Sequence, residues 1–331
     1  MRVQIVSESA FTVPGHGVHS AFLEHVQYLT GCPGMRPIVN GRPRRDADIV
    51  HVHTTGPYAA VLLLTGRGAK VASAHVVPDS LRGSIVGARI LRRLIRAYLT
   101  WFYNRADLVI AVSEAVQADL TAMQIKTPIK IIPNWVRVTE ARQSPSLRAS
   151  LGLGESDVLV VSVGQMQPRK GVTGFLAAAR ALPQLQFLWV GDAIFGPASS
   201  GRITLRRALA SAPPNVRWAG QVPRERVYDF LAAADIYLSL SEHETFGLAV
   251  LEAASFGCPL VLADLPVFRT TYGDAAQYSP PGGPAPLLSA LAGSAAERRQ
   301  WGARAAGAAR KYDAESGGEQ LLAAYRRLLS R

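Results

Sequence analysis

Cysteine, charge and long apolar runs are all scarce in this chain of 331 residues, and each scarcity excludes a class of protein. Cys32 and Cys258 are its two cysteines, too few and too far apart for a disulfide framework or a metal cluster, which fits a reducing cytoplasm. Charged residues are only 18% and hydrophobic residues 48%, a composition typical of a compact α/β enzyme rather than a disordered protein. We expect neither a signal peptide nor a spanning helix, because no apolar run approaches roughly 20 residues.

The charged residues of the chain are predominantly positive. The net charge is +12, and residues 1–139 carry 16 Lys and Arg against 8 Asp and Glu. Residues 140–331 carry 20 against 16. The excess of arginine in the first half predicts an anionic partner, which leaves nucleic acid, anionic lipid and a phosphorylated substrate as candidates.

Short β-branched runs alternate with segments of helical periodicity along the whole chain, and the same rhythm restarts after a polar break at 139–148. Strands that alternate with helices predict parallel sheets covered on both faces. We therefore expect an α/β fold of two Rossmann-like, doubly wound domains that face a cleft. The first covers residues 1–139, the second covers 140–313, and an amphipathic helix at 314–331 can reach back to the first.

The segment 236–263 has the form strand, polar turn, helix, strand. Glu244 then follows the carboxyl end of a strand, and 246–248 begin a helix whose free amides and dipole favour phosphate. Glu252 lies roughly 8 Å further along that helix, so the two carboxylates suit an elongated ligand better than paired acid–base chemistry. A helix-start residue and a solvated helix residue are the plain alternative, but Glu252 has apolar neighbours and needs a partner.

This segment resembles the Glu–x7–Glu signature, with Phe-Gly inside it, of the family-4 retaining glycosyltransferases, which have the GT-B fold. The resemblance implies that the domain at 140–313 binds a nucleotide sugar and the domain at 1–139 binds the acceptor. It implies that Glu244 contacts the donor sugar and that Glu252 binds the ribose. It also implies that the amides after Phe246 and Gly247, at Leu248, contact the pyrophosphate.

The loop Val163–Gly171 follows another strand and resembles the basic pyrophosphate loop of the same family. Lys170 falls on the family's lysine, whereas Gln165 stands where many members have arginine, and Arg169 can compensate. The resemblance implies front-face transfer in which the leaving phosphate assists deprotonation of the acceptor. Arg169, Lys170 and the helix amides would stabilise the developing charge. Having recognised no Asp-x-Asp metal motif, we expect no obligatory metal, and no cofactor besides a UDP-hexose donor.

Two features of the first domain also resemble the family. Gly15 and Gly17 form a glycine loop before the first helix, where the backbone approaches donor phosphates, although Ser20 leaves the dinucleotide fingerprint incomplete. His75 ends a strand and matches the histidine that the family places near the transferred sugar. Taken alone, the glycines are equally consistent with a turn, and a single histidine is more often structural.

The segment 82–105 combines arginines on one helical face with apolar and aromatic residues elsewhere. This pattern is typical of an interfacial membrane anchor, and a helix packed on the sheet with a solvated basic face explains it equally well. The residues assigned to the membrane and acceptor are Arg89, Arg92, Arg93, Arg96, Trp101 and Phe102.

The resemblance is closest to bacterial diacylglycerol glycosyltransferases. It implies transfer of glucose or galactose, with retention, from a nucleotide sugar to a membrane lipid such as diacylglycerol, by a cytoplasmic protein peripheral on the inner face of the membrane. A polyprenyl-linked, phosphatidylinositol or polysaccharide acceptor is the alternative within this class. A non-catalytic nucleotide-binding protein and a nucleic-acid-binding protein are the alternatives outside it, and we expect no nucleic acid because aromatic-interleaved basic motifs are absent.

Overall fold

The computed structural model describes residues 1–9, 17–81, 91–137, 145–192 and 202–330. These residues form two compact units. The first includes Met1–Leu81 and the chain from Tyr312 onward, and the second ends at Lys311. The C-terminal segment therefore belongs to the same unit as the N-terminus.

The sheet of the first unit is parallel throughout, with strand order β2-β1-β3-β4-β5-β6. Apolar residues of β1 and β3 are buried on both faces, as is typical of parallel strands covered by helices. Strand order reverses between β1 and β3, so the ends of these strands form the switch point at which such sheets bind ligands. The strands are β1 Arg2–Val6, β2 Arg36–Val39, β3 Ile49–Val52, β4 Ala69–Ala74, β5 Leu108–Ala111 and β6 Ile129–Ile131.

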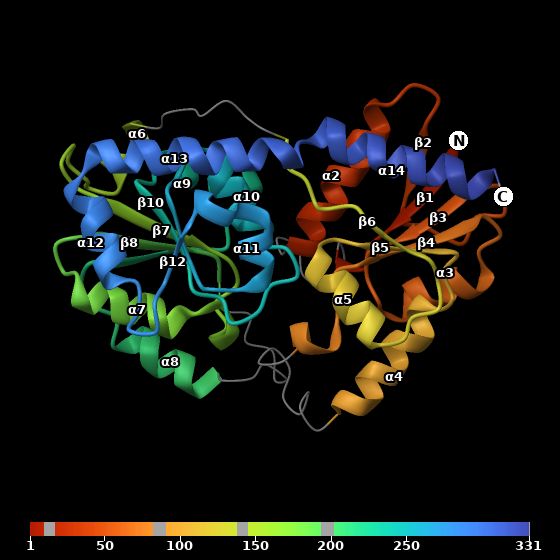
Figure 1. Cartoon of the computed structure of the whole chain (residues 1–331), viewed down its shortest axis with the longest axis horizontal. Coiled ribbons are helices and arrows are strands. Elements are labelled where there is room, and N and C mark those ends of the chain that lie inside the picture. Colours follow the sequence, from red (N-terminus) through yellow and green to blue (C-terminus); the bar gives the residue numbers. More distant parts are fainter. Residues whose placement is uncertain (10–16, 82–90, 138–144, 193–201, 331) are drawn as a thin grey trace. The chain divides into compact units, whose positions relative to one another are not determined.

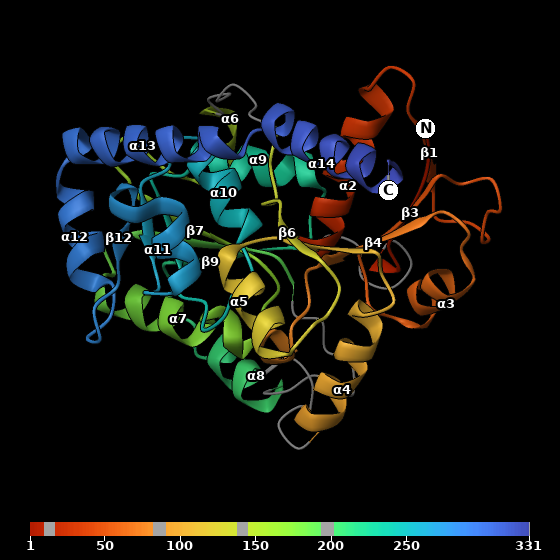
Figure 2. The ribbon, with the colours of Figure 1, turned by 45° about the vertical axis from the view of Figure 1, so that its right-hand side comes forward.

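Helices cover both faces of this sheet (Figures 1 and 2). One face packs against α2 and the C-terminal α14, whose Leu321 and Tyr325 are fully buried in the same core as Phe22. The other face is covered by α3, α4 and α5. The bounds are α2 Gly17–Gly31, α3 Pro57–Thr65, α4 Arg92–Tyr103, α5 Glu114–Ala122 and α14 Ala314–Leu329, with a 3-10 turn at Pro78–Leu81.

The sheet of the second unit is also parallel, with order β12-β11-β10-β7-β8-β9. Read from its far edge this is 3-2-1-4-5-6, the order of dinucleotide-binding domains, and its switch point lies between β7 and β10. The strands are β7 Leu159–Val163, β8 Gln186–Val190, β9 Val216–Gly220, β10 Ile236–Ser239, β11 Leu260–Leu262 and β12 Gln277–Tyr278.

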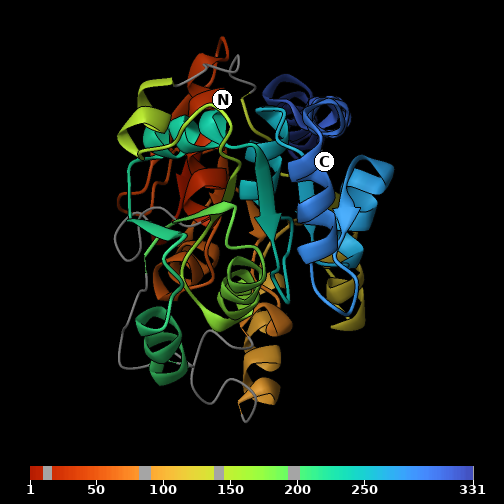
Figure 3. The ribbon, with the colours of Figure 1, turned by 90° about the vertical axis from the view of Figure 1, so that its left-hand side faces the viewer.

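Two layers of helices enclose this second sheet (Figures 1 and 3). Phe175 of α7 and Leu288 of α12 share a buried cluster with one face, and α9 and α10 cover the other. The bounds are α6 Pro145–Ser150, α7 Val172–Ala181, α8 Arg202–Ala210, α9 Arg224–Ala233, α10 Leu248–Ser255, α11 Pro266–Tyr272, α12 Ala285–Gly293 and α13 Ala295–Ala309, with 3-10 turns at Pro168–Lys170, Gly273–Ala275 and Arg310–Tyr312.

The two parallel sheets confirm the predicted doubly wound α/β fold. The strands other than β2 and β12 coincide with the short apolar runs of the sequence. Two short edge strands, β2 and β12, were not anticipated, because four and two residues carry too little periodicity to be recognised. Among the described residues, no helix has both the length and the apolar character needed to cross a bilayer.

Candidate active site

The switch point of the second unit brings two loops together. β7 and β10 are paired neighbours, so the loop after β7, which carries Lys170, and the loop after β10, which carries Glu244, leave the same edge of the sheet. Lys170 Nζ lies 2.5 Å from Glu244 Oε1, and Ser241 Oγ donates to that oxygen at 2.9 Å. Residues 74 positions apart thus form one polar site where the strand order predicts a ligand.

This ion pair is largely removed from solvent, with side-chain exposures of 20% for Lys170 and 13% for Glu244. Burial lowers the pKa of the Lys170 ammonium, although Glu244 opposes that shift. Burial alone would raise the pKa of Glu244, but Lys170 and Arg169 outweigh it and hold that pKa below its ordinary value. Glu244 is therefore ionised at neutral pH, and its charge is compensated inside the protein.

Two successive hydrogen bonds between side chains orient Arg169 beside the Lys170–Glu244 pair. Gln167 Nε2 donates to Gln165 Oε1 at 3.0 Å, and Arg169 Nε donates to Gln167 Oε1 at 3.1 Å. Gln165 therefore supplies no charge, but it fixes the glutamine that holds the guanidinium. Sequence reasoning missed the role of Gln167, since no spacing rule links a glutamine to an arginine two residues later in a loop.

Two glycines are required by the backbone of this site. Gly171 (φ +78°) begins α7, and a Cβ there would collide with the carbonyl oxygen of Leu240. Gly247 (φ +86°) caps α10, and a Cβ there would lie 2.6 Å from Phe268. Left-handed backbone with no room for a side chain explains both glycines. α10 consequently begins at Leu248, with its amino end and positive dipole at the switch point.

Glu252 of α10 has the partner that its apolar surroundings demand. It is 6% exposed, and its Oε1 accepts from Arg224 Nε at 3.1 Å and from Nη2 at 2.8 Å. Arg224 begins α9 and lies over the ring of Tyr228. The sequence indicated that a partner was needed but could not identify it, because the arginine is 28 residues away on another helix.

In the first unit, His75 follows β4 and is buried. Its Nε2 lies 3.1 Å from Nδ1 of His53, which follows β3. Gly17 is the first residue of α2, and nothing lies within 4 Å of a Cβ built there, so close packing does not require this glycine. Gly15, the other glycine of the expected loop, lies outside the described residues.

The structure divides the residues expected on the acceptor helix. Phe102 is 1% exposed and packs in the core beside Leu99 and Tyr103, so its assignment to an acceptor surface was wrong. These aromatics belong to the packed face because i and i+3 positions share one side of a helix. Leu91, at 46%, Leu94, at 67%, and Tyr98, at 39%, are instead exposed.

The arginines of α4 have limited fixed contacts. Arg92 lies 3.5 Å from Asp79, and Arg96 Nη2 donates to the carbonyl of Ala122 at 2.5 Å. Arg93 is exposed, Trp101 is half-buried under the guanidinium of Arg105, and Arg89 lies outside the described residues.

One motif was overlooked in the expectation of no metal: Asp46 and Asp48 form an Asp-x-Asp triplet. Asp46 bonds Arg2 at 2.7 Å and Arg44 at 2.9 Å, and Asp48 accepts the backbone N–H of Arg2 at 2.7 Å. Arg2 opens β1, so this triplet is at the amino end of the sheet, opposite the edge where doubly wound sheets bind ligands. Both carboxylates therefore bind residues at the amino end of the sheet.

Comparison with known proteins gives one consistent result. Residues 143–278 match the family model described as glycosyl transferases group 1, and residues 10–140 match glycosyltransferase family 4. The alpha-galactosylglucosyldiacylglycerol synthase of Streptococcus pneumoniae is 32% identical over 81% of this chain and 74% of its own length. The processive diacylglycerol alpha-glucosyltransferase of Acholeplasma laidlawii is 24% identical over 81% of this chain and 80% of its own length.

Solved structures agree on the fold. The HepE protein of Anabaena, in complex with UDP and glucose, superposes with a TM-score of 0.80 over 99% of this chain and 100% of that chain, at 19% identity. Sucrose-phosphate synthase of Thermosynechococcus elongatus also gives 0.80, over 100% of this chain and 99% of that one, at 17% identity. At such identities the likeness concerns the GT-B fold.

Proposed function

Because this chain belongs to the group 1, family 4 glycosyltransferases, we propose that it transfers a hexose, with retention, from a UDP-sugar to a membrane lipid such as diacylglycerol. The observation that carries the proposal is the Lys170–Glu244 pair at the switch point of the second unit. The names of two relatives, both diacylglycerol-linked synthases, support the acceptor. The UDP and glucose bound by HepE support the donor.

In this proposal the second unit holds the donor. The carboxylate of Glu244 accepts sugar hydroxyls, and Lys170, Arg169 and the first amides of α10 receive the diphosphate. The pair that Lys170 and Glu244 form with each other holds both side chains in place before the donor arrives. Glu252, anchored by Arg224, offers carboxylate oxygen to the ribose. No metal is needed for this charge balance, because two cations and a helix terminus face the diphosphate.

The leaving diphosphate then acts as the base. As the bond from the anomeric carbon to phosphate oxygen breaks, negative charge grows on that oxygen, and Lys170 and Arg169 stabilise it. The same oxygen accepts the proton of the acceptor hydroxyl. The hydroxyl oxygen attacks the anomeric carbon from the face that the phosphate leaves. Retention follows because both bonds lie on one face of the sugar. His75 of the first unit is the residue that the family resemblance assigns to the transferred sugar.

The acceptor side of the proposal uses α4. Exposed Leu91 and Leu94 lie among Arg92 and Arg93, a combination of insertable apolar groups and cations that suits an anionic lipid surface. Such docking would place the protein peripherally on the inner face of the membrane, where diacylglycerol resides in the lipid layer.

A product analysis tests the proposed reaction. The protein is incubated with UDP-glucose, UDP-galactose and GDP-mannose in turn, with vesicles of phosphatidylglycerol and diacylglycerol, and products are identified by mass and anomeric configuration. We expect an α-hexosyl diacylglycerol from a UDP-sugar. Glycosylation of phosphatidylinositol, a polyprenyl phosphate or only soluble acceptors, with diacylglycerol untouched, would replace the proposed acceptor by an alternative one.

Changing Leu94 to glutamate tests the membrane surface separately. It removes an apolar side chain worth about 2 kcal/mol of burial and adds a charge repelled by anionic lipid, so vesicle binding should weaken at least tenfold in sedimentation. Leu329→Glu on α14, which is 44% exposed, is the matched control and should bind as the unchanged protein does. Equal binding by both variants would show that α4 is a scaffold helix.

A further inference from the structure

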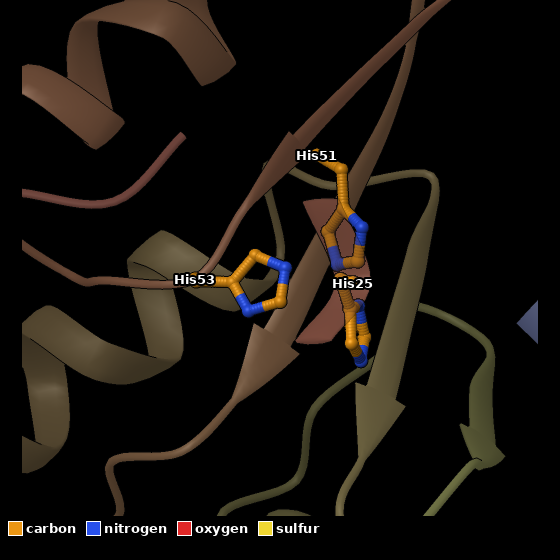
Figure 4. A group of neighbouring side chains, drawn as sticks. All are labelled: His25, His51 and His53. Carbon is orange, nitrogen blue, oxygen red and sulfur yellow. The ribbon is translucent and has the colours of Figure 1, made fainter. Parts of the chain in front are cut away.

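Three histidines converge in the interior of the first unit (Figure 4). His25 comes from α2, His51 from β3, and His53 directly follows that strand. They are 3%, 0% and 1% exposed, and one ligand nitrogen from each lies within 4.8 Å of the other two. Neither the family matches nor the relatives' names assign these residues a role.

Two nitrogens of this cluster have no hydrogen-bond partner among the described residues. These are Nδ1 of His25 and Nε2 of His53, and the indole Nε1 of Trp135, whose ring stacks on His25 at 4.1 Å, is also unpaired. A buried polar atom left without a partner costs about 1–3 kcal/mol. Two such histidine nitrogens in one buried cluster indicate that a species absent from the polypeptide completes the site.

All three imidazoles are buried. A neutral imidazole carries one lone pair, which is the group through which histidine binds a metal ion.

Three other ring nitrogens of the cluster, two of His51 and one of His53, are held by neighbours that set ring orientation. Nδ1 of His53 is bonded to His75 at 3.1 Å. Nδ1 of His51 lies 2.6 Å from the Tyr325 hydroxyl, and its Nε2 lies 2.8 Å from Ser73 Oγ. Histidine ligands are usually oriented through the nitrogen that does not bind the metal. To bind a metal ion, His51 must give up one of its two hydrogen bonds. His25 and His53 each have a nitrogen without a hydrogen-bond partner.

From this geometry we propose that His25, His51 and His53 bind one divalent first-row transition metal ion, with zinc as the species best matched to three imidazoles. Zinc–nitrogen bonds of about 2.0–2.1 Å put two tetrahedral ligands about 3.4 Å apart. The ligand nitrogens now lie within 4.8 Å of one another, so binding the ion requires them to move closer by up to about 1.4 Å. The ion ties α2 to the carboxyl end of β3 and thereby stabilises the first unit, and its binding can be measured without the reaction proposed above.

Metal titration tests this site directly. Tag-free, chelator-treated protein is titrated with Zn²⁺ against a chromophoric chelator, and with Co²⁺ to observe visible d–d bands. We expect one equivalent of Zn²⁺ per chain, a Co²⁺ spectrum of tetrahedral nitrogen ligation, and a higher melting temperature with Zn²⁺. Less than stoichiometric binding, or a spectrum of hexa-aquo-like Co²⁺, would overturn the proposal.

Variants identify the ligands. His25→Phe keeps an aromatic ring against Trp135 but removes both nitrogens, and Zn²⁺ affinity should fall at least a hundredfold. His19→Gln is the matched control, since His19 lies on the same helix outside the cluster, and it should bind as the unchanged protein does. Unaltered affinity in His25→Phe would refute the assignment. If that variant does not fold, the Co²⁺ spectrum of the unchanged protein decides alone.

Discussion

Lys170→Ala is expected to reduce kcat by about 10²- to 10³-fold, because removing one preorganised donor to a developing oxyanion has effects of that size. Lys170 Nζ is 2.5 Å from Glu244 and is the cation that strand order places at the switch point. Substrate-saturated initial rates, measured with the donor–acceptor pair identified by product analysis, report this loss. Glu244→Gln should also lose activity, since an amide accepts sugar hydroxyls more weakly than a carboxylate.

The same substitution has a second effect that must be separated from the first. Lys170→Ala removes the ion-pair partner of the largely buried Glu244 carboxylate, and breaking a buried pair in this way costs about 3–5 kcal/mol of stability. The double variant Lys170→Met/Glu244→Leu removes both charges, so its stability should recover while its activity does not. A double variant that regained turnover would mean that the pair maintains the fold and takes no part in catalysis.

A surface pair provides the matched control for these variants. Arg226 and Asp229 lie 2.7 Å apart on α9, with exposures of 55% and 38%. Exposed pairs contribute little, so Arg226→Ala should leave both kcat and the melting temperature close to those of the unchanged protein. If Arg226→Ala lost as much activity as Lys170→Ala, the loss would reflect the removal of any positive charge and not the position of Lys170.

Leu321→Ala should destabilise the first unit by about 2–5 kcal/mol, because it opens a cavity in a core that surrounding residues cannot refill. Leu321 is fully buried, and its helix α14 closes one face of the sheet that α2 also covers. Hydrogen exchange of β1 and β3 amides, followed by mass spectrometry, measures the loss where it occurs.

The same helix supplies its own control. Leu329 lies eight residues further along α14 and is 44% exposed, so Leu329→Ala should change stability by no more than about 0.5 kcal/mol. If the β1 and β3 amides were equally protected from hydrogen exchange in the two variants, the C-terminal segment would not complete the first unit's core.

The sequence predicted the parts of this protein that depend on local pattern. Alternating strands and helices predicted two parallel sheets, since burial on both faces demands continuous apolar runs. The strand–turn–helix around Glu244 predicted a helix terminus suited to phosphate, because a helix's first amides are unbonded whatever surrounds them. The edge strands β2 and β12 escaped notice because pairing, not residue pattern, defines segments so short.

Contacts between distant residues required the tertiary structure. That Lys170 meets Glu244, that Arg224 neutralises Glu252, and that His25 joins His51 and His53 all depend on which strands and helices become neighbours. The burial of Phe102 also depended on the tertiary structure, because the sequence alone does not say which face of α4 packs against the sheet. Sequence periodicity determines which elements form, whereas strand order and packing decide which side chains share a site.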